Sequence, residues 1–208
     1  MMDKQIKSRE RVASHGEVFT ADKEVRAMCD LVNDEAVDLN AKILEPACGE
    51  GNFLLEILQR RLNALAVDGA NNFELNSLIA LSNLYGIDIL PDNVKACREK
   101  LFKLWREFYI EFNNDEDAQD WLKDLVNEIL EKNIICGDAL TCSLVDGQGG
   151  IKFTKWTIGE EVITQEYKLE DLMQEQDDKN CLFPFEPQPV KKSVRKLSGL
   201  KNAAKSAE

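Results

Sequence analysis

The stretch Ile43-Leu-Glu-Pro-Ala-Cys-Gly-Glu-Gly-Asn-Phe-Leu54 joins a short apolar run, a Gly-x-Gly turn and the start of a helical pattern. Ala41–Glu45 predicts a buried strand, because it is apolar and closed by an acid. Apolar residues spaced three to four apart from Phe53 to Leu65 predict a helix after the turn. Glycines there let the backbone approach a ligand closely at the carboxyl end of a sheet. The stretch therefore predicts a ligand site in an α/β fold.

The same order of strand and helix continues along the chain. Apolar runs at 84–89 and 133–136 predict two more strands, and periodic apolar residues predict helices from Pro91 to 108 and from 121 to 130. Strands that alternate with helices predict a mainly parallel sheet with right-handed crossovers. Upstream of the first strand, Thr20 is expected to cap a helix. Residues 67–80 are expected to form a loop or a broken helix.

The pattern changes after Asp138. Runs at 151–158 and 162–169 flank Gly-Glu-Glu and predict a hairpin, followed by a short acidic helix at 169–177 and an extended, proline-punctuated segment at 183–189. Three parts are therefore expected: 1–149, with the ligand site; 150–189, the hairpin and extended segment; and 190–208, a basic tail. The tail has a net charge of +5 and little core-forming pattern. It is expected to be a disordered, solvated arm, with phosphate contact as the alternative.

Charge and cysteine content restrict the function classes. The net charge of −12 argues against a self-sufficient module for duplex DNA, which usually carries a basic face. Six cysteines without a CxxC pair, and His15 as the only histidine, argue against a metal site. The cysteines are expected to be reduced thiols of a cytoplasmic protein. No apolar run is long enough to span a bilayer, and the first ten residues do not resemble a signal peptide.

Two acids end the second and third predicted strands. Asp88 could accept hydrogen bonds from both hydroxyls of an adenosine ribose, and Ile89 could lie against the base. Asp138 could accept from an adenine amine. A nicotinamide cofactor is disfavoured because the third glycine of the dinucleotide fingerprint is replaced by Phe53 and Leu54. No Gly-Lys-Ser/Thr phosphate loop occurs in the sequence.

With these acids, Glu45-Pro-Ala-Cys-Gly-Glu-Gly-Asn-Phe resembles motif I of the S-adenosylmethionine-dependent DNA methyltransferases, in particular the adenine-N6 branch of restriction–modification systems. His15-Gly-Glu-Val-Phe-Thr20 resembles the amino-terminal motif of that branch, with Ala21 where the family usually has Pro. Asp88 and Asp138 match the acids of the next two motifs. The resemblance covers roughly residues 14–140. It implies a Rossmann-like class I methyltransferase fold, here apparently truncated to about three parallel strands with flanking helices and a C-terminal hairpin.

The resemblance also implies S-adenosyl-L-methionine as cofactor and a role for each matching residue. Glu45 would face the methionine ammonium group, and Thr20 would bond the methionine carboxylate. Asp88 would hold the ribose and Ile89 the adenine face. The adenine amine would reach Asp138, with the Ala139 N–H as a further donor. The full set of implied cofactor contacts is Phe19, Thr20, Glu45, Ala47, Cys48, Gly49, Gly51, Phe53, Asp88, Ile89, Asp138 and Ala139.

The family's catalytic motif, Asn/Asp-Pro-Pro-aromatic, is absent, since no two of the five prolines are adjacent. No Pro-Cys dipeptide occurs either, so no catalytic residue is assigned. The chain is therefore expected to be a cofactor-binding portion that is inactive alone. The alternative is a non-catalytic remnant, or a regulatory or interaction module derived from such an enzyme. DNA would be reached only through a separate catalytic and recognition part.

The missing fourth strand has a structural consequence. In the family's sheet this strand pairs with the first strand, so Ala41–Glu45 is expected to leave one edge unpaired. Either the 150–189 segment or a partner polypeptide would have to cover that edge.

Overall fold

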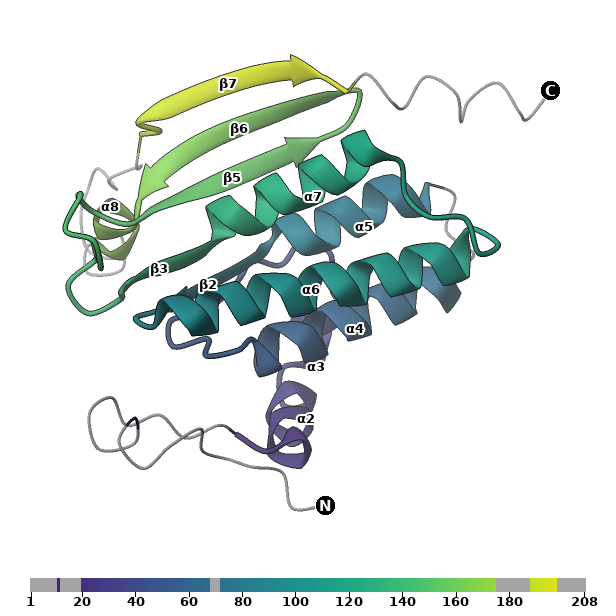
Figure 1. The fold of residues 1–208 in the computed structure, drawn as a ribbon, viewed down its shortest axis with the longest axis horizontal. Coiled ribbons are helices and arrows are strands. Elements are labelled where there is room, and N and C mark those ends of the chain that lie inside the picture. The colour runs from purple at the N-terminus through teal and green to yellow at the C-terminus, as the bar shows by residue number, and fades with distance from the viewer. Residues whose placement is uncertain (1–10, 12–19, 68–71, 175–187, 198–208) are drawn as a thin grey trace, which may run out of the picture.

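The computed structural model describes Arg11 and residues 20–67, 72–174 and 188–197. The amino-terminal motif up to Phe19, including His15, lies outside these residues, and so does most of the proline-punctuated segment at 183–189. The described part is a mixed α/β fold with two sheets and a layer of helices (Figure 1).

The main sheet contains the three predicted strands. β1 (Ile43–Glu45) pairs in parallel with β2 (Leu84–Asp88), and β2 pairs in parallel with β3 (Ile134–Asp138). A two-residue strand that the pattern did not predict, β4 (Ser143–Leu144), runs antiparallel to β3. The order β1-β2-β3-β4 leaves one edge of β1 without a paired strand among the described residues, as expected.

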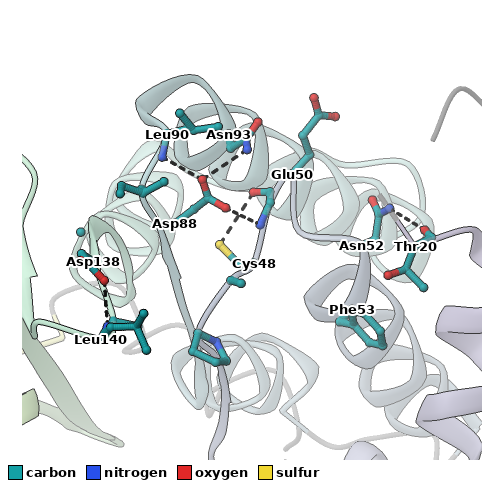
Figure 2. Close-up of a pocket in the computed structure, with 16 residues that line it drawn as sticks. Thr20, Cys48, Glu50, Asn52, Phe53, Asp88, Leu90, Asn93, Asp138 and Leu140 are labelled. Atoms are coloured by element: carbon teal, nitrogen blue, oxygen red, sulfur yellow. Dashed lines mark hydrogen bonds between the residues drawn. The ribbon is translucent and has the colours of Figure 1, made fainter. Parts of the chain in front are cut away.

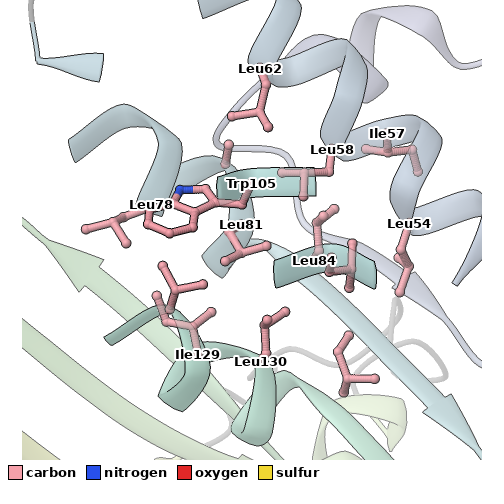
Figure 3. Packing of buried hydrophobic residues seen from close by; sticks show 14 of the residues in the cluster. Leu54, Ile57, Leu58, Leu62, Leu78, Leu81, Leu84, Trp105, Ile129 and Leu130 are labelled. Carbon is pink, nitrogen blue, oxygen red and sulfur yellow. The ribbon is translucent and has the colours of Figure 1, made fainter. Parts of the chain in front are cut away.

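Six helices in this part of the chain precede or connect the strands of the main sheet. α2 (Asp22–Asp30) and α3 (Asn33–Val37) precede β1, and α4 (Asn52–Val67) follows it. α5 (Phe73–Ser82) leads into β2, and α6 (Pro91–Phe112) and α7 (Asp120–Asn133) connect β2 to β3. Their apolar faces share one core, in which side chains from α4, α5, α6 and α7 surround Trp105 (Figure 3). That core holds the strands at fixed positions, and so the loops at their carboxyl ends.

Two local expectations upstream of β2 change. Residues 67–80 were expected to be a loop or a broken helix, and the structure favours the helix: α4 ends at Val67, α5 begins at Phe73, and α5 is buried on several sides, including Ser77 and Ser82. Thr20 does not cap α2: the helix begins one residue later, with Ala21 at the N-cap position and no side-chain cap bond. Ala21 has no acceptor side chain, so no side-chain cap bond forms; its carbonyl accepts the ordinary first helical bond from Val25 N at 3.0 Å and a bond from Glu24 N at 2.9 Å.

The hairpin after residue 150 forms as predicted, but it belongs to a larger sheet. β5 (Lys152–Ile158) and β6 (Glu161–Lys168) pair antiparallel, and the short helix α8 (Leu169–Gln174) follows. β7 (Lys191–Lys196) then pairs antiparallel with β6. The prediction of a disordered arm is therefore wrong for residues 191–196. Two of its basic residues pair with acids: Lys191 with Glu166 at 3.9 Å, and Arg195 with Glu128 of α7.

The second sheet covers the helices and part of the main sheet. Trp156 is buried in the main core and donates from Nε1 to Asn133 Oδ1 of α7 at 3.0 Å. Phe153 packs beside Tyr85 of β2 in a second apolar cluster with Ile87 and Ile135. The described part of the 150–189 segment therefore does not pair with the free edge of β1. It covers β2 and β3 from the side.

Candidate functional site

A pocket of about 550 Å³ lies at the carboxyl ends of β1, β2 and β3 (Figure 2). The loops after the three strands form its walls, and the first turn of α4 and Thr20, two residues before α2, close it. Its lining is Thr20, Pro46, Ala47, Cys48, Gly49, Glu50, Asn52, Phe53, Asp88, Ile89, Leu90, Asn93, Gly137, Asp138, Ala139 and Leu140.

Backbone hydrogen bonds fix the loop between β1 and α4 against β2. Cys48 N donates to Ile87 O at 2.8 Å, and Gly49 N donates to Asp88 Oδ2 at 2.9 Å. Gly49 has φ of 53°, in the left-handed region that glycine enters without strain. The loop therefore presents its backbone to the pocket and places Gly49 directly beside Asp88.

Gly51 shapes the same loop from behind. It has φ of 90°, and a Cβ at this position would lie 2.6 Å from Cys97 Sγ of α6. Its carbonyl accepts the first helical bond of α4, from Leu55 N at 2.8 Å. The buried Cys48 thiol lies on the same side, and its hydrogen bond with Cys97 together with burial raises the Cys48 pKa. The thiol is therefore a neutral packing group and not a nucleophile.

Asp88 is the most connected side chain of the site. Oδ2 accepts from Gly49 N, while Oδ1 accepts from Leu90 N at 2.8 Å and from Asn93 Nδ2 at 3.2 Å. A carboxylate has about four acceptor positions, so these three bonds leave one, on Oδ2. As the pocket stands, Asp88 can accept from one further hydroxyl. A second would have to displace the Asn93 amide.

Asn93 was not identified from the sequence, although it is only 1% exposed. Its Oδ1 accepts from Arg11 at 3.3 Å, which orients its amide nitrogen toward Asp88. Arg11 also bonds to Asp92, with its Nη1 2.7 Å from Oδ2. A signal existed in the sequence: Asn93 is a polar residue beside the apolar face of the predicted helix. Val94 follows it directly, and Cys97 lies one turn later.

The loop after β3 forms the opposite wall. Asp138 Oδ1 accepts from Leu140 N at 2.9 Å, which closes a tight turn around Ala139. Leu140 is 95% exposed at the mouth of the pocket. The turn uses one of about four acceptor positions of the Asp138 carboxylate, a residue of the pocket lining.

The third wall is the start of α4. Asn52 Nδ2 donates to Thr20 O at 3.3 Å, which ties the segment before α2 to this helix. Glu50 Oε2 lies 2.5 Å from Lys100 Nζ. The first amides of a helix have no partner within the helix and attract negative groups. The site thus combines an anion-favouring helix end with two carboxylates, Asp88 and Asp138, that accept from hydroxyls and amines.

Nine of the twelve predicted contact residues line the pocket: Thr20, Ala47, Cys48, Gly49, Phe53, Asp88, Ile89, Asp138 and Ala139. Gly51 and Glu45 do not line it. Gly51 supports the loop from below, and Glu45 Oε1 accepts from Ala47 N at 3.3 Å. Phe19 lies outside the described residues. Pro46, Glu50, Asn52, Leu90, Asn93, Gly137 and Leu140 also line the pocket, and they were not among the twelve implied contact residues.

The titratable side chains of this lining are Cys48, Glu50, Asp88 and Asp138. Within the described residues no group of three or more His, Cys, Asp or Glu side chains is arranged to hold a metal ion. None of the helices in this part of the chain is both long and apolar enough to cross a membrane.

Searches against protein-family models, curated proteins and solved structures find no match for this chain.

Proposed function

We propose that this pocket binds S-adenosyl-L-methionine and that the chain is the cofactor-binding portion of a DNA adenine-N6 methyltransferase of the restriction–modification type. The observation that carries the proposal is the convergence of a Gly-x-Gly turn, Asp88 and Asp138 in one pocket, from the ends of three consecutive parallel strands. The strand order, with helices after β1 and β2, is compatible with a Rossmann-like methyltransferase fold.

The pocket suits this ligand in size and chemistry. Its volume of about 550 Å³ lies within the range of small-molecule sites. The start of α4 favours the methionine carboxylate, and the remaining acceptor on Asp88 favours a ribose hydroxyl. Asp138, with the exposed Ile89 nearby in the lining, favours an adenine ring with its amine. S-Adenosylmethionine, when bound, supplies an activated methyl group.

Calorimetric titration of the purified chain with S-adenosyl-L-methionine tests the proposal. Binding is expected, and Asp88→Asn should weaken it about tenfold or more, because a charged acceptor is worth about 1.5–3 kcal/mol. Asp138→Asn should also weaken it. Asp146→Asn is its matched control: Asp146 Oδ1 accepts from Gln148 N at 2.9 Å in the same kind of turn, but Asp146 does not line the pocket.

Two outcomes of the titration would contradict the proposal. One is the absence of heat at millimolar ligand with a chain that unfolds cooperatively. The other is an equal affinity in Asp88→Asn, Asp138→Asn and the Asp146→Asn control. Melting temperatures of the three variants show whether a weaker affinity reflects the contact or loss of the fold.

A second candidate is a non-catalytic binding or regulatory module. It is favoured by the sequence, which has no Asn-Pro-Pro-aromatic motif, and by the described lining, which has no histidine or lysine to act as a base. Both candidates predict that this chain alone transfers no labelled methyl group to adenine-containing DNA. They differ when a polypeptide with the catalytic motif is added, since only the methyltransferase portion then supports transfer.

A further inference from the structure

A second groove, of about 710 Å³, lies beside β1 and β2. Its apolar lining includes Leu44, Tyr85, Ile87, Phe153, Leu169 and Leu172. It shares Pro46 and Ala139 with the site described above, so the two hollows adjoin at the carboxyl end of the sheet. The groove is larger than the first pocket and has no role in the proposed function.

The free edge of β1 borders this groove. Ile43 N donates to Asn83 O at 2.9 Å, so the backbone groups of Ile43 point toward β2. Backbone groups point alternately to the two sides of a strand, so the N–H and C=O of Leu44 point to the free edge. Leu44 is 44% exposed, and no described strand pairs with it on that side.

The side chains at this edge line the groove. Lys42, Leu44 and Pro46 are alternate residues and all three belong to its lining, whereas Ile43 packs against the main core. A strand added to this edge would therefore place every second side chain over the groove. Backbone pairing together with pockets for alternate side chains is the recognition mode of an added strand.

The charges indicate what the added strand would carry. Lys42 and Lys155 line the groove and are exposed, and neither forms an ion pair with another described residue. On the opposite face of the second sheet, by contrast, Lys191 and Arg195 are paired with Glu166 and Glu128. Acidic side chains would complement the two lysines of the groove.

We propose that this surface binds an extended segment of a second polypeptide, which adds to β1 as a strand. Apolar side chains at alternate positions fill the groove, and acidic side chains at the same face meet Lys42 and Lys155. The alternative ligand is a small apolar anion. It would occupy the groove and pair with the lysines, but it would not bond to the backbone groups of Leu44. The inference does not depend on what the first pocket binds.

The probe is a fluorescein-labelled peptide, Glu-Thr-Val-Thr-Val-Thr-Glu, whose alternate Glu and Val side chains share one face in either direction. Anisotropy should show saturable binding to the chain. The same peptide with all internal amides N-methylated should not bind, because it keeps the side chains and loses the backbone donors. Equal binding of the methylated peptide, or no binding of the parent peptide at about 1 mM, would overturn the proposal.

Charge variants locate the contact. Lys155→Glu should weaken peptide binding about fivefold or more, and a peptide with Lys in place of one terminal Glu should restore part of it, because the other Glu still meets Lys42. Lys152→Glu is the matched control, because Lys152 is an exposed residue of β5 that does not line the groove. Loss of affinity equal in the two variants would contradict the assignment. S-Adenosylmethionine titration of both variants keeps this result separate from the proposed function.

Hydrogen exchange at the Leu44 amide tests the edge itself. The amide should exchange rapidly in the chain alone and become protected when the peptide is added. Protection in the chain alone would contradict the proposal, since residues of the same chain would then occupy the edge.

Discussion

At the residue scale, Gly51 is a position where two constraints on substitution meet. Two effects act there together: the left-handed φ of 90°, and the 2.6 Å that would separate a new Cβ from Cys97 Sγ. Gly147 provides a comparison, because its φ is 71° and nothing lies within 4 Å of a Cβ built on it. The two glycines therefore separate backbone strain from crowding.

Gly51→Ala is expected to lower the free energy of unfolding by roughly 2–4 kcal/mol, of which about 1–2 is strain and the rest is overpacking. Gly147→Ala should lose only the strain. Cys97→Ala should restore part of the loss in a double variant, because it removes the sulfur atom. Urea denaturation of the parent, Gly51→Ala, Cys97→Ala and the double variant measures this coupling. Gly147→Ala is measured beside them as the comparison. Equal losses at Gly51 and Gly147 would show that the contact with Cys97 is not tight.

Glu74 of α5 is a partly buried carboxyl group. Burial raises its pKa, and the hydrogen bond from Tyr109 OH at 3.5 Å lowers it by less. A carboxyl whose folded pKa lies above its unfolded value stabilises the fold below the unfolded pKa. It loses that contribution as pH rises through the folded pKa.

Glu74→Gln should therefore raise the melting temperature at pH 7, where the native carboxylate is charged and partly desolvated. The difference between variant and parent should shrink as the pH is lowered toward 4.5, the ordinary value for Glu. Thermal denaturation from pH 4 to 7.5 checks this, with Glu99→Gln, at an exposed position of α6, as control. A gain that is constant with pH would exclude the titration of Glu74 as its cause.

At the element scale, the sequence predicted the strands that are short apolar runs and the helices that have a single apolar stripe. β2 and β3 are short apolar runs, and α6 and α7 have clear apolar stripes. α5 has no such stripe because it is buried on several sides, with Ser77 bonding to Trp105 Nε1 at 3.1 Å. β7 is exposed at every residue, so it has no apolar pattern that would predict a strand. Its pairing with β6 forms the strand, and ion pairs with Glu166 and Glu128 add to it.

The site residues that the sequence predicted also belong to local patterns. Glycines and acids at strand ends are local features of the sequence, and most of the pocket lining follows from them. The role of Asn93 depends on Arg11, which is 82 residues away and reaches it only in the folded chain. The sharing of Asp88 between Gly49, Leu90 and Asn93 likewise needs three segments to meet. Such contacts have no local signature.

Arg61 of α4 joins several elements. It is fully buried, and it donates to Ala80 O of α5 at 2.9 Å and to Ala41 O just before β1 at 2.6 Å. A longer bond of 3.4 Å reaches Glu35 O of α3. Burial lowers the pKa of Arg61 to about 10, so the guanidinium stays charged at neutral pH.

Arg61→Leu should cost roughly 2–4 kcal/mol of unfolding free energy, because buried carbonyls lose their donors. The neighbouring Arg60→Leu is the control. Arg60 pairs with Asp30 at 2.8 Å and with Glu56 at 2.9 Å nearer the surface, and its loss should cost about 1 kcal/mol. Chemical denaturation compares the two. A smaller loss at Arg61 than at Arg60 would show that Arg61 does not join the elements.

At the scale of the whole molecule, the two sheets act as one unit. Trp156, Val162 and Leu197 from the second sheet are buried in the same core as the helices of the first. Tyr85 OH donates to Thr154 O at 3.1 Å and adds a polar link between the sheets. β2 and β3, two of the strands whose carboxyl ends border the first pocket, are therefore held from both sides.

Hydrogen–deuterium exchange with and without saturating S-adenosyl-L-methionine tests directly whether this pocket holds the ligand. Slower exchange is predicted in the three loops that line the pocket, at 46–53, 88–93 and 137–140. Exchange in β5 and β6 should not change. Unchanged exchange in all three loops, or protection confined to another part of the chain, would contradict the account.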